Sequence, residues 1–90
     1  MPDVIDNVAE NRFELVEEGL TAFADYDRRD GRMLIRYVES PPPLRGKGTA
    51  GRLMEGVLAA ARAEGLKVTP ICGYAAAYIR RHKEHQDLLV

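Results

Sequence analysis

The chain has 90 residues, of which 46% are hydrophobic and 30% charged, and its formal net charge is −1. This length predicts one small domain over residues 1–90, and the composition is typical of an ordinary soluble protein. A nearly neutral charge argues against a general nucleic-acid binder, which usually carries a large basic excess. A domain this small buries a modest share of its surface, so a bound cofactor or a homodimer would add stability.

Cysteine content and apolar runs bear on the compartment. Cys72 is the one cysteine, which excludes an internal disulfide and fits a reducing compartment. The first residues lack the basic and apolar regions of a secretion signal, and no apolar run approaches the about 20 residues of a membrane span. We therefore expect a cytoplasmic protein.

Three alternating segments in the first half of the chain predict antiparallel strands. Residues 12–17, 20–26 and 33–38 alternate apolar and polar side chains, which is the period of a half-buried strand. Glu18-Gly19 and Asp30-Gly31 lie between these segments, and Asp-Gly is a strong signal for a tight hairpin. The pattern predicts a three-stranded meander that still needs a cover on one face.

The second half changes to a helical period. Prolines at 41–43 end the third strand, and residues 50–64 then predict a helix that Gly65 terminates. The apolar face of that helix consists of Leu53, Met54, Val57, Leu58 and Ala61. Residues 67–72 predict a short strand and residues 74–83 a second helix. The expected order is β-β-β-α-β-α, in the α+β class.

Between the third strand and the first helix lies Arg45-Gly46-Lys47-Gly48-Thr49-Ala50, which we call the glycine turn (residues 45–50). Glycines let a backbone approach an anion closely, and the first amides of a helix have no partner inside it. The amides from Gly46 to Ala50, with the charges of Arg45 and Lys47, therefore suit a pyrophosphate. The alternative is a solvated connection in which the glycines only permit the turn. The spacing fits neither a Walker A loop nor the dinucleotide fingerprint.

The glycine turn also carries a resemblance. Arg45-x-x-Gly48-x-Ala50 is similar to the Q/R-x-x-G-x-G/A element with which the GNAT N-acetyltransferase superfamily binds the pyrophosphate of acetyl-coenzyme A. Much of the remaining chain resembles a subfamily of very short GNAT-like proteins that consist of little more than the cofactor-binding core. The segments that carry this wider resemblance are 12–15, 39–48, 65–72, 77–82 and 87–90.

The resemblance implies a GNAT-type fold, with a mixed, mostly antiparallel sheet and two main helices. It also implies that the strand ending at 37–40 separates from the strand at 68–71, leaving a gap for the pantetheine arm. Its implied ligand is acetyl-coenzyme A or coenzyme A. The residues expected at this ligand are Glu39, Ser40, Leu44, Arg45, Gly46, Lys47, Gly48, Thr49, Ala50, Tyr74, Tyr78 and Arg81.

Two positions depart from the subfamily pattern. Tyr37 stands where the subfamily usually has His, and Gly73-Tyr74 stands where it usually has Pro-Phe. A tyrosine does not act as a base near neutral pH as histidine does, because its ordinary pKa is near 10. Cofactor binding depends mainly on backbone groups and is less affected.

Cys72 and Tyr78 are the candidates for catalysis. The resemblance places Cys72 close to the acetyl thioester, where it is either a nucleophile or a small buried apolar side chain. In many GNAT enzymes a tyrosine near Tyr78 protonates the departing thiolate, and the alternative is a core or lid aromatic with its hydroxyl at the surface. Glu39 is a further candidate base, although a carboxylate at a strand end is more often simply solvated.

The last helix carries histidines and basic residues. His82 and His85 are expected at the surface and not in a metal site, since no third ligand clusters near them in the sequence. Arg81, with its neighbours Arg80 and Lys83, either meets the 3′-phosphate of the cofactor or only favours the helix dipole.

The expected function is transfer of an acetyl group from acetyl-coenzyme A to an unidentified amine or protein acceptor, directly or through Cys72. The alternative is a sensor or adaptor that holds acetyl-coenzyme A without turnover. Neither a nucleic acid nor a membrane is expected as a partner.

Overall fold

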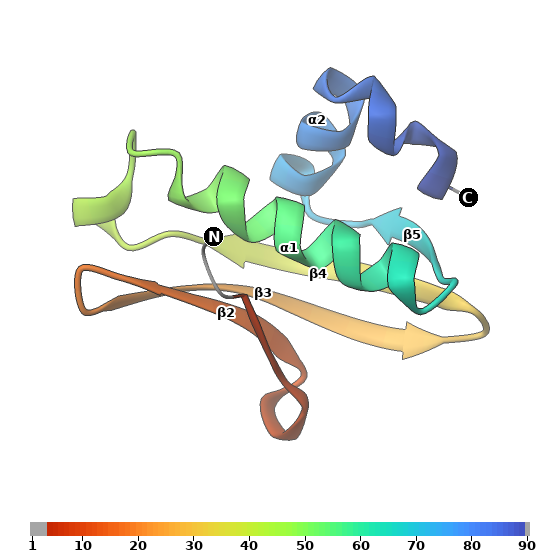
Figure 1. Ribbon diagram of the computed structural model, residues 1–90, viewed down its shortest axis with the longest axis horizontal. Helices are drawn as coiled ribbons and strands as arrows, with labels where there is room; N and C mark the ends of the chain where they lie inside the picture. The colour runs from red at the N-terminus through yellow and green to blue at the C-terminus, as the bar shows by residue number, and fades with distance from the viewer. Residues whose placement is uncertain (1–3, 90) are drawn as a thin grey trace.

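A computed structural model describes residues 4–89 as one twisted sheet with helices packed on one of its faces (Figure 1). The strand order is β1-β2-β3-β4-β5, with β1 to β4 antiparallel and β5 parallel to β4. The strands are β1 (Ile5–Asn7), β2 (Arg12–Glu17), β3 (Leu20–Arg29), β4 (Arg32–Glu39) and β5 (Lys67–Pro70). The helices are α1 (Thr49–Ala63) and α2 (Gly73–Arg81), with 3-10 segments η1 (Val8–Glu10), η2 (Pro42–Leu44) and η3 (Lys83–Leu88).

The expected mixed, mostly antiparallel sheet with two main helices is confirmed. The sequence did not predict β1, which has three residues and, within the described part of the chain, pairs with β2 alone at the edge of the sheet. Its Ile5 is 61% exposed, so no buried face marks this strand in the sequence. A segment this short shows no alternation that could separate it from a loop.

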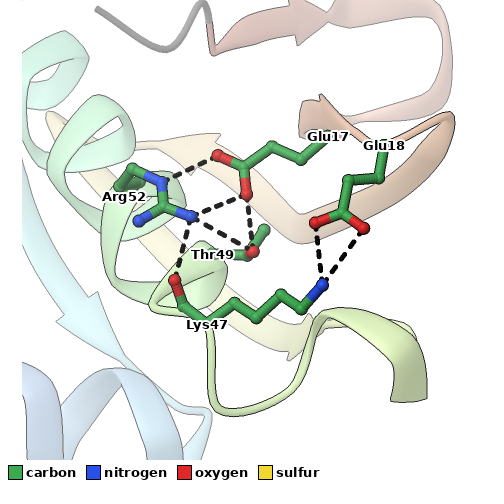
Figure 2. Close-up of polar contacts among 5 residues, drawn as sticks. All are labelled: Glu17, Glu18, Lys47, Thr49 and Arg52. Atoms are coloured by element: carbon green, nitrogen blue, oxygen red, sulfur yellow. Dashed lines mark hydrogen bonds and ion pairs between the residues drawn. The ribbon is translucent and has the colours of Figure 1, made fainter.

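Both predicted hairpin turns form. Glu18 and Gly19 have φ values of 53° and 76°, and Asp30 and Gly31 have 54° and 74°. Two successive residues at positive φ make the two-residue turn whose twist matches the flanking strands. The β2–β3 turn is important for the site because it lies beside the start of α1 (Figure 2).

Helix α1 ends as the sequence predicted. Gly65 has φ +70°, its amide donates to the Arg62 carbonyl at 3.2 Å, and the Leu66 amide donates to the Ala61 carbonyl at 2.9 Å. This pair of bonds is the Schellman cap that glycine favours. All five residues of the predicted apolar face are fully buried against the sheet.

Strands β4 and β5 separate partway along β4. Their pairing ends at Ile35 and Pro70, and the Ile35 carbonyl then accepts the amides of both Ile71 and Cys72, at 2.9 and 3.0 Å. Among the described residues, β5 offers no partner to the end of β4 from Arg36 to Glu39. The expected gap between these strands is therefore present.

Within residues 4–89, no helix has the length and the apolar character needed to cross a membrane.

Candidate functional site

The glycine turn connects η2 to the first residue of α1. Gly46 and Gly48 have φ values of +80° and +81°, in the left-handed region that glycine enters without steric cost. Gly48 is the N-cap residue of α1, and no side chain of the described chain caps this helix. The first amides of α1 therefore lack the partner that a Ser, Thr or Asp cap would supply.

Several amides at this helix start have no hydrogen-bond partner within residues 4–89. They are those of Gly46, Gly48, Thr49, Ala50 and Gly51. The Lys47 amide differs, because it donates to the Leu44 carbonyl at 3.2 Å. The run of amides expected from Gly46 to Ala50 is thus interrupted at Lys47. The remaining amides lie at the positive end of the α1 dipole, which favours an anion.

Side chains tie the turn to the β2–β3 hairpin (Figure 2). The Arg52 guanidinium donates from Nε to Glu17 Oε2 and from Nη2 to Glu17 Oε1, both at 2.7 Å. The same Nη2 lies 3.1 Å from the Lys47 carbonyl oxygen. Thr49, which is buried, donates from Oγ1 to Glu17 Oε1 at 2.6 Å. We call these groups (Glu17, Thr49, Arg52 and the Lys47 carbonyl) the Arg52 network, which the sequence analysis missed.

The Arg52 network changes the titration of Glu17. The hydrogen bonds from Arg52 first, and then from Thr49, lower the pKa of the Glu17 carboxyl to about 2. The carboxylate therefore remains charged over the whole neutral range, and the charges of Glu17 and Arg52 balance beside the turn.

The two cations of the glycine turn have different surroundings. The Lys47 ammonium lies 2.9 and 3.1 Å from the carboxylate oxygens of Glu18, so its charge is held at the β2–β3 turn (Figure 2). Arg45 is exposed, donates from Nε to the Ser40 carbonyl at 3.0 Å, and has no carboxylate partner among residues 4–89. Arg45 is thus the cation of the turn that is available to an anion in this conformation.

The expected ligand residues that precede the glycine turn differ in how far they are exposed to solvent. Leu44 is buried at 1% exposure, whereas Glu39 and Ser40 are half-buried. The Tyr37 hydroxyl donates to Glu39, and this bond raises the pKa of Tyr37 above its ordinary value. Tyr37 therefore stays protonated at neutral pH, and Glu39 is hydrogen-bonded and not simply solvated.

Cys72 lies where β5 ends and α2 begins. It is the N-cap residue of α2, its amide bonds to Ile35, and its half-buried side chain packs against the hydrophobic core. Tyr74, on the first turn of α2, is 40% exposed. The fold thus places Cys72 at the point where β4 and β5 separate, which is compatible with both of its predicted roles.

Tyr78 connects α2 to the first turns of α1. Its ring lies over Gly51, where an added Cβ would meet the ring at 3.6 Å, and its hydroxyl donates to the Glu55 carboxylate. Burial first, and then this bond, raise the pKa of Tyr78 well above its ordinary value. The Tyr78 ring also stacks on His82 with centroids 3.9 Å apart. The hydroxyl is therefore engaged inside the fold and does not lie free at the surface.

The expectation that His82 and His85 are surface residues is wrong for His85 and partly met for His82. His82 is half-buried, and His85 is buried, with Nε2 3.1 Å from both carboxylate oxygens of Glu55. The sequence analysis did not predict a second grouping, in which Glu55, Glu84 and His85, without His82, have ligand atoms within 4.8 Å of one another. Hydrogen bonds from Tyr78 and His85 hold Glu55 in this group, and Glu84 directly precedes His85 in the chain. The fold creates it because η3 packs back onto α1.

Arg81 is exposed in the last turn of α2. This position suits the helix dipole, and the side chain is also accessible to a ligand.

A hollow of about 430 Å³ lies against the sheet face opposite the helices. Its acidic lining includes Glu10, Asp25 and Asp27, and the lining also contains Arg36 and Tyr37. Arg36 already pairs with Asp27 at 2.8 Å. The excess of negative charge makes this hollow less suited to a diphosphate than the start of α1, where amides without a partner among residues 4–89 lie at the positive end of the helix.

Comparisons with known proteins bear on the family and the fold of this chain. The family model described as GCN5-related N-acetyl-transferase matches residues 12–88. The NMR solution structure of a GCN5-like protein from Staphylococcus aureus is similar, with a TM-score of 0.70 and 22% sequence identity. That similarity covers 98% of this chain and 87% of the other, and at this identity it supports the fold alone. Among curated proteins, none matches this chain significantly.

Proposed function

Because the chain belongs to the GCN5-related N-acetyltransferase family, we propose that it binds acetyl-coenzyme A at the glycine turn and transfers the acetyl group to an amine. The observation that carries this proposal is the group of amides at the start of α1 that have no hydrogen-bond partner among residues 4–89. A diphosphate offers acceptor oxygens for these amides, and the exposed Arg45 adds a positive charge.

The separated end of β4 supports a place for the pantetheine arm. Between Arg36 and Glu39, this strand has backbone groups that β5 does not pair. An extended ligand with amide groups can hydrogen-bond such an edge as an added strand would. In this arrangement the thioester comes close to Cys72, which lies at the same separation point.

The proposed transfer joins the amine nitrogen to the thioester carbon and breaks the carbon–sulfur bond. The amine loses one proton and the coenzyme A sulfur gains one, which leaves an amide and a thiol. In the covalent version, the Cys72 thiolate first takes the acetyl group and then passes it to the amine. Because its hydroxyl donates to Glu55, Tyr78 shapes the site through its ring in this proposal and does not supply the proton.

A second candidate function is a module that holds acetyl-coenzyme A without turnover. Tyr37 favours it, because its raised pKa excludes it as a base at neutral pH where the short GNAT-like proteins usually have histidine. This candidate uses the same cofactor site and differs only in the absence of an efficient acceptor reaction.

Thermal unfolding with coenzyme A and with acetyl-coenzyme A tests the binding that both functions require. A ligand specific for the folded state stabilises it by about 2.7 kcal/mol at a hundred times its Kd, so the midpoint should rise by several degrees. An unchanged midpoint with both compounds, at millimolar concentrations, contradicts the cofactor assignment.

Labelled acetyl-coenzyme A, offered with a panel of amines and peptides, separates the enzyme from the binding module. Label that enters an amine supports transfer, whereas binding without label in any acceptor supports the module. In the covalent version, Cys72→Ala abolishes transfer while coenzyme A binding persists. An unchanged rate removes Cys72 from the mechanism.

A further inference from the structure

We propose that Glu17 and Arg52 are positioning residues, which orient the peptide between Lys47 and Gly48 so that the glycine turn receives a diphosphate. This inference rests on the proposed function, since it concerns how the same anion site is built.

The orientation follows from the geometry of one peptide group. Arg52 Nη2 holds the Lys47 carbonyl oxygen at 3.1 Å, on the side of the turn that faces β2 (Figure 2). In a planar trans peptide the C=O and the following N–H point in opposite directions. The Gly48 amide therefore points away from the Arg52 network. With this carbonyl released, the peptide could rotate and present a negative oxygen where the anion needs a donor.

Arg52 can hold that carbonyl because Glu17 fixes the guanidinium. The two parallel bonds to Glu17 engage Nε and Nη2, the same nitrogen that reaches the Lys47 carbonyl. A bidentate arginine–carboxylate pair fixes direction as well as distance. Thr49, buried at 1% exposure, adds a third contact to Glu17 and secures the first residue of α1. The network thus joins strand β2 to the turn through one guanidinium.

A positioning role and simple charge repulsion predict opposite effects on coenzyme A binding when the Glu17 carboxylate is neutralised. A carboxylate beside an anion site repels the anion, so its neutralisation should strengthen binding on charge alone. If Glu17 instead acts through Arg52, its neutralisation loosens the guanidinium and weakens binding. The neighbouring Glu18 provides the matched comparison, because it pairs with the Lys47 ammonium and, among the described residues, makes no hydrogen bond or ion pair with Arg52.

The experiment measures the dissociation constant of coenzyme A by calorimetry for the wild type, Glu17→Gln, Arg52→Lys and Glu18→Gln. Arg52→Lys keeps the positive charge and loses the pair of parallel hydrogen bonds to the Glu17 carboxylate. We expect Glu17→Gln and Arg52→Lys to bind about tenfold more weakly, the scale of one lost hydrogen bond to a charged group. Glu18→Gln should bind as tightly as the wild type or more tightly, because Lys47 is released toward the anion.

Two further measurements separate positioning from loss of folding. The Gly48 amide resonance should shift when coenzyme A is added to the wild type and shift much less in Arg52→Lys. Arg62→Lys breaks another two-bond arginine–carboxylate pair, the more exposed one with Asp87 far from the glycine turn, and its affinity for coenzyme A should be unchanged.

The outcomes distinguish this inference from the proposed function. A wild type that does not bind coenzyme A overturns the proposed function itself. A wild type that binds, with Glu17→Gln and Arg52→Lys binding equally well or better, overturns the positioning role alone. If Glu17→Gln does not fold, the affinity and the Gly48 resonance of Arg52→Lys decide the question.

Discussion

The Glu17 carboxylate links acid stability to the architecture of the site. Its pKa is lowered to about 2 by bonds from Arg52 and Thr49, whereas the ordinary value is 4.5. As the pH falls below about 4.5, the unfolded chain takes up the proton first. The stabilisation by this group is therefore complete above about pH 4.5 and is lost progressively toward pH 2.

Glu17→Gln should consequently flatten the acid unfolding profile. We expect the free energy of unfolding of the variant to fall less steeply than that of the wild type between pH 4.5 and 2, as followed by circular dichroism in urea. Equal slopes for both proteins would show that the Arg52 network does not persist in solution.

Tyr78 is a second residue whose hydrogen bond can be tested by mutation. Its bond to Glu55 joins α2 to α1, and hydrogen bonds to charged groups stabilise folded proteins by about 1.5–3 kcal/mol. Because Glu55 is half exposed and water can replace the hydroxyl, we expect Tyr78→Phe to lose about 1 kcal/mol in urea unfolding.

A double-mutant cycle with Glu55→Ala, which removes the acceptor oxygen, checks that this loss comes from the bond itself. The losses in free energy of unfolding of the two single variants should add up to more than the loss in the double variant. The acetyl-transfer rate of Tyr78→Phe tests separately whether the hydroxyl takes part in catalysis. If Tyr78 shapes the site only through its ring, this rate should persist, and a collapse of the rate would return the hydroxyl to the role of proton donor.

At the scale of elements, the glycine turn offers a matched pair of substitutions. Gly46 and Gly48 have nearly the same positive φ, so alanine at either position should cost about 1 kcal/mol of stability. An added Cβ at Gly48 would lie 3.0 Å from Arg52 Nη1, whereas at Gly46 it would meet nothing within 4 Å. The two positions thus share the backbone cost and differ in their contact with the Arg52 network.

We therefore expect Gly48→Ala to weaken coenzyme A binding more than Gly46→Ala, although both unfold at similarly reduced urea concentrations. A larger loss of affinity in Gly46→Ala would contradict the assignment of Arg52 as the group that orients this turn.

For the whole molecule, one core joins α1, α2 and the sheet. Leu58 is fully buried at the centre of α1, and Leu→Ala changes at such sites cost about 2–5 kcal/mol. A domain of this size has a total stability of about 5–14 kcal/mol. Leu58→Ala should therefore lower the urea midpoint strongly.

Val16→Ala is the control for this prediction, because Val16 is 59% exposed on the uncovered sheet face. Its free energy of unfolding should remain within about 0.5 kcal/mol of the wild type. A large loss at Val16 would indicate that this face is covered in solution, for example by a second copy of the chain.

The sequence by itself determined the features that depend on neighbours along the chain. The hairpin turn at Asp30-Gly31, the buried face of α1 and its end at Gly65 each follow from backbone freedom or from apolar spacing over a few residues. The position of the glycine turn before α1 follows from the same local signals.

Only the tertiary structure decided which side chains meet. Lys47 pairs with Glu18 at a separation of 29 residues, and Arg52 with Glu17 at 35. The bond between His85 and Glu55 spans 30 residues. Local patterns specify which face of an element is apolar, but they do not specify which charged residue of a distant element lies opposite. For this reason the sequence did not predict the pairing of Lys47 with Glu18, and the expected exposure of His85 differed from the structure.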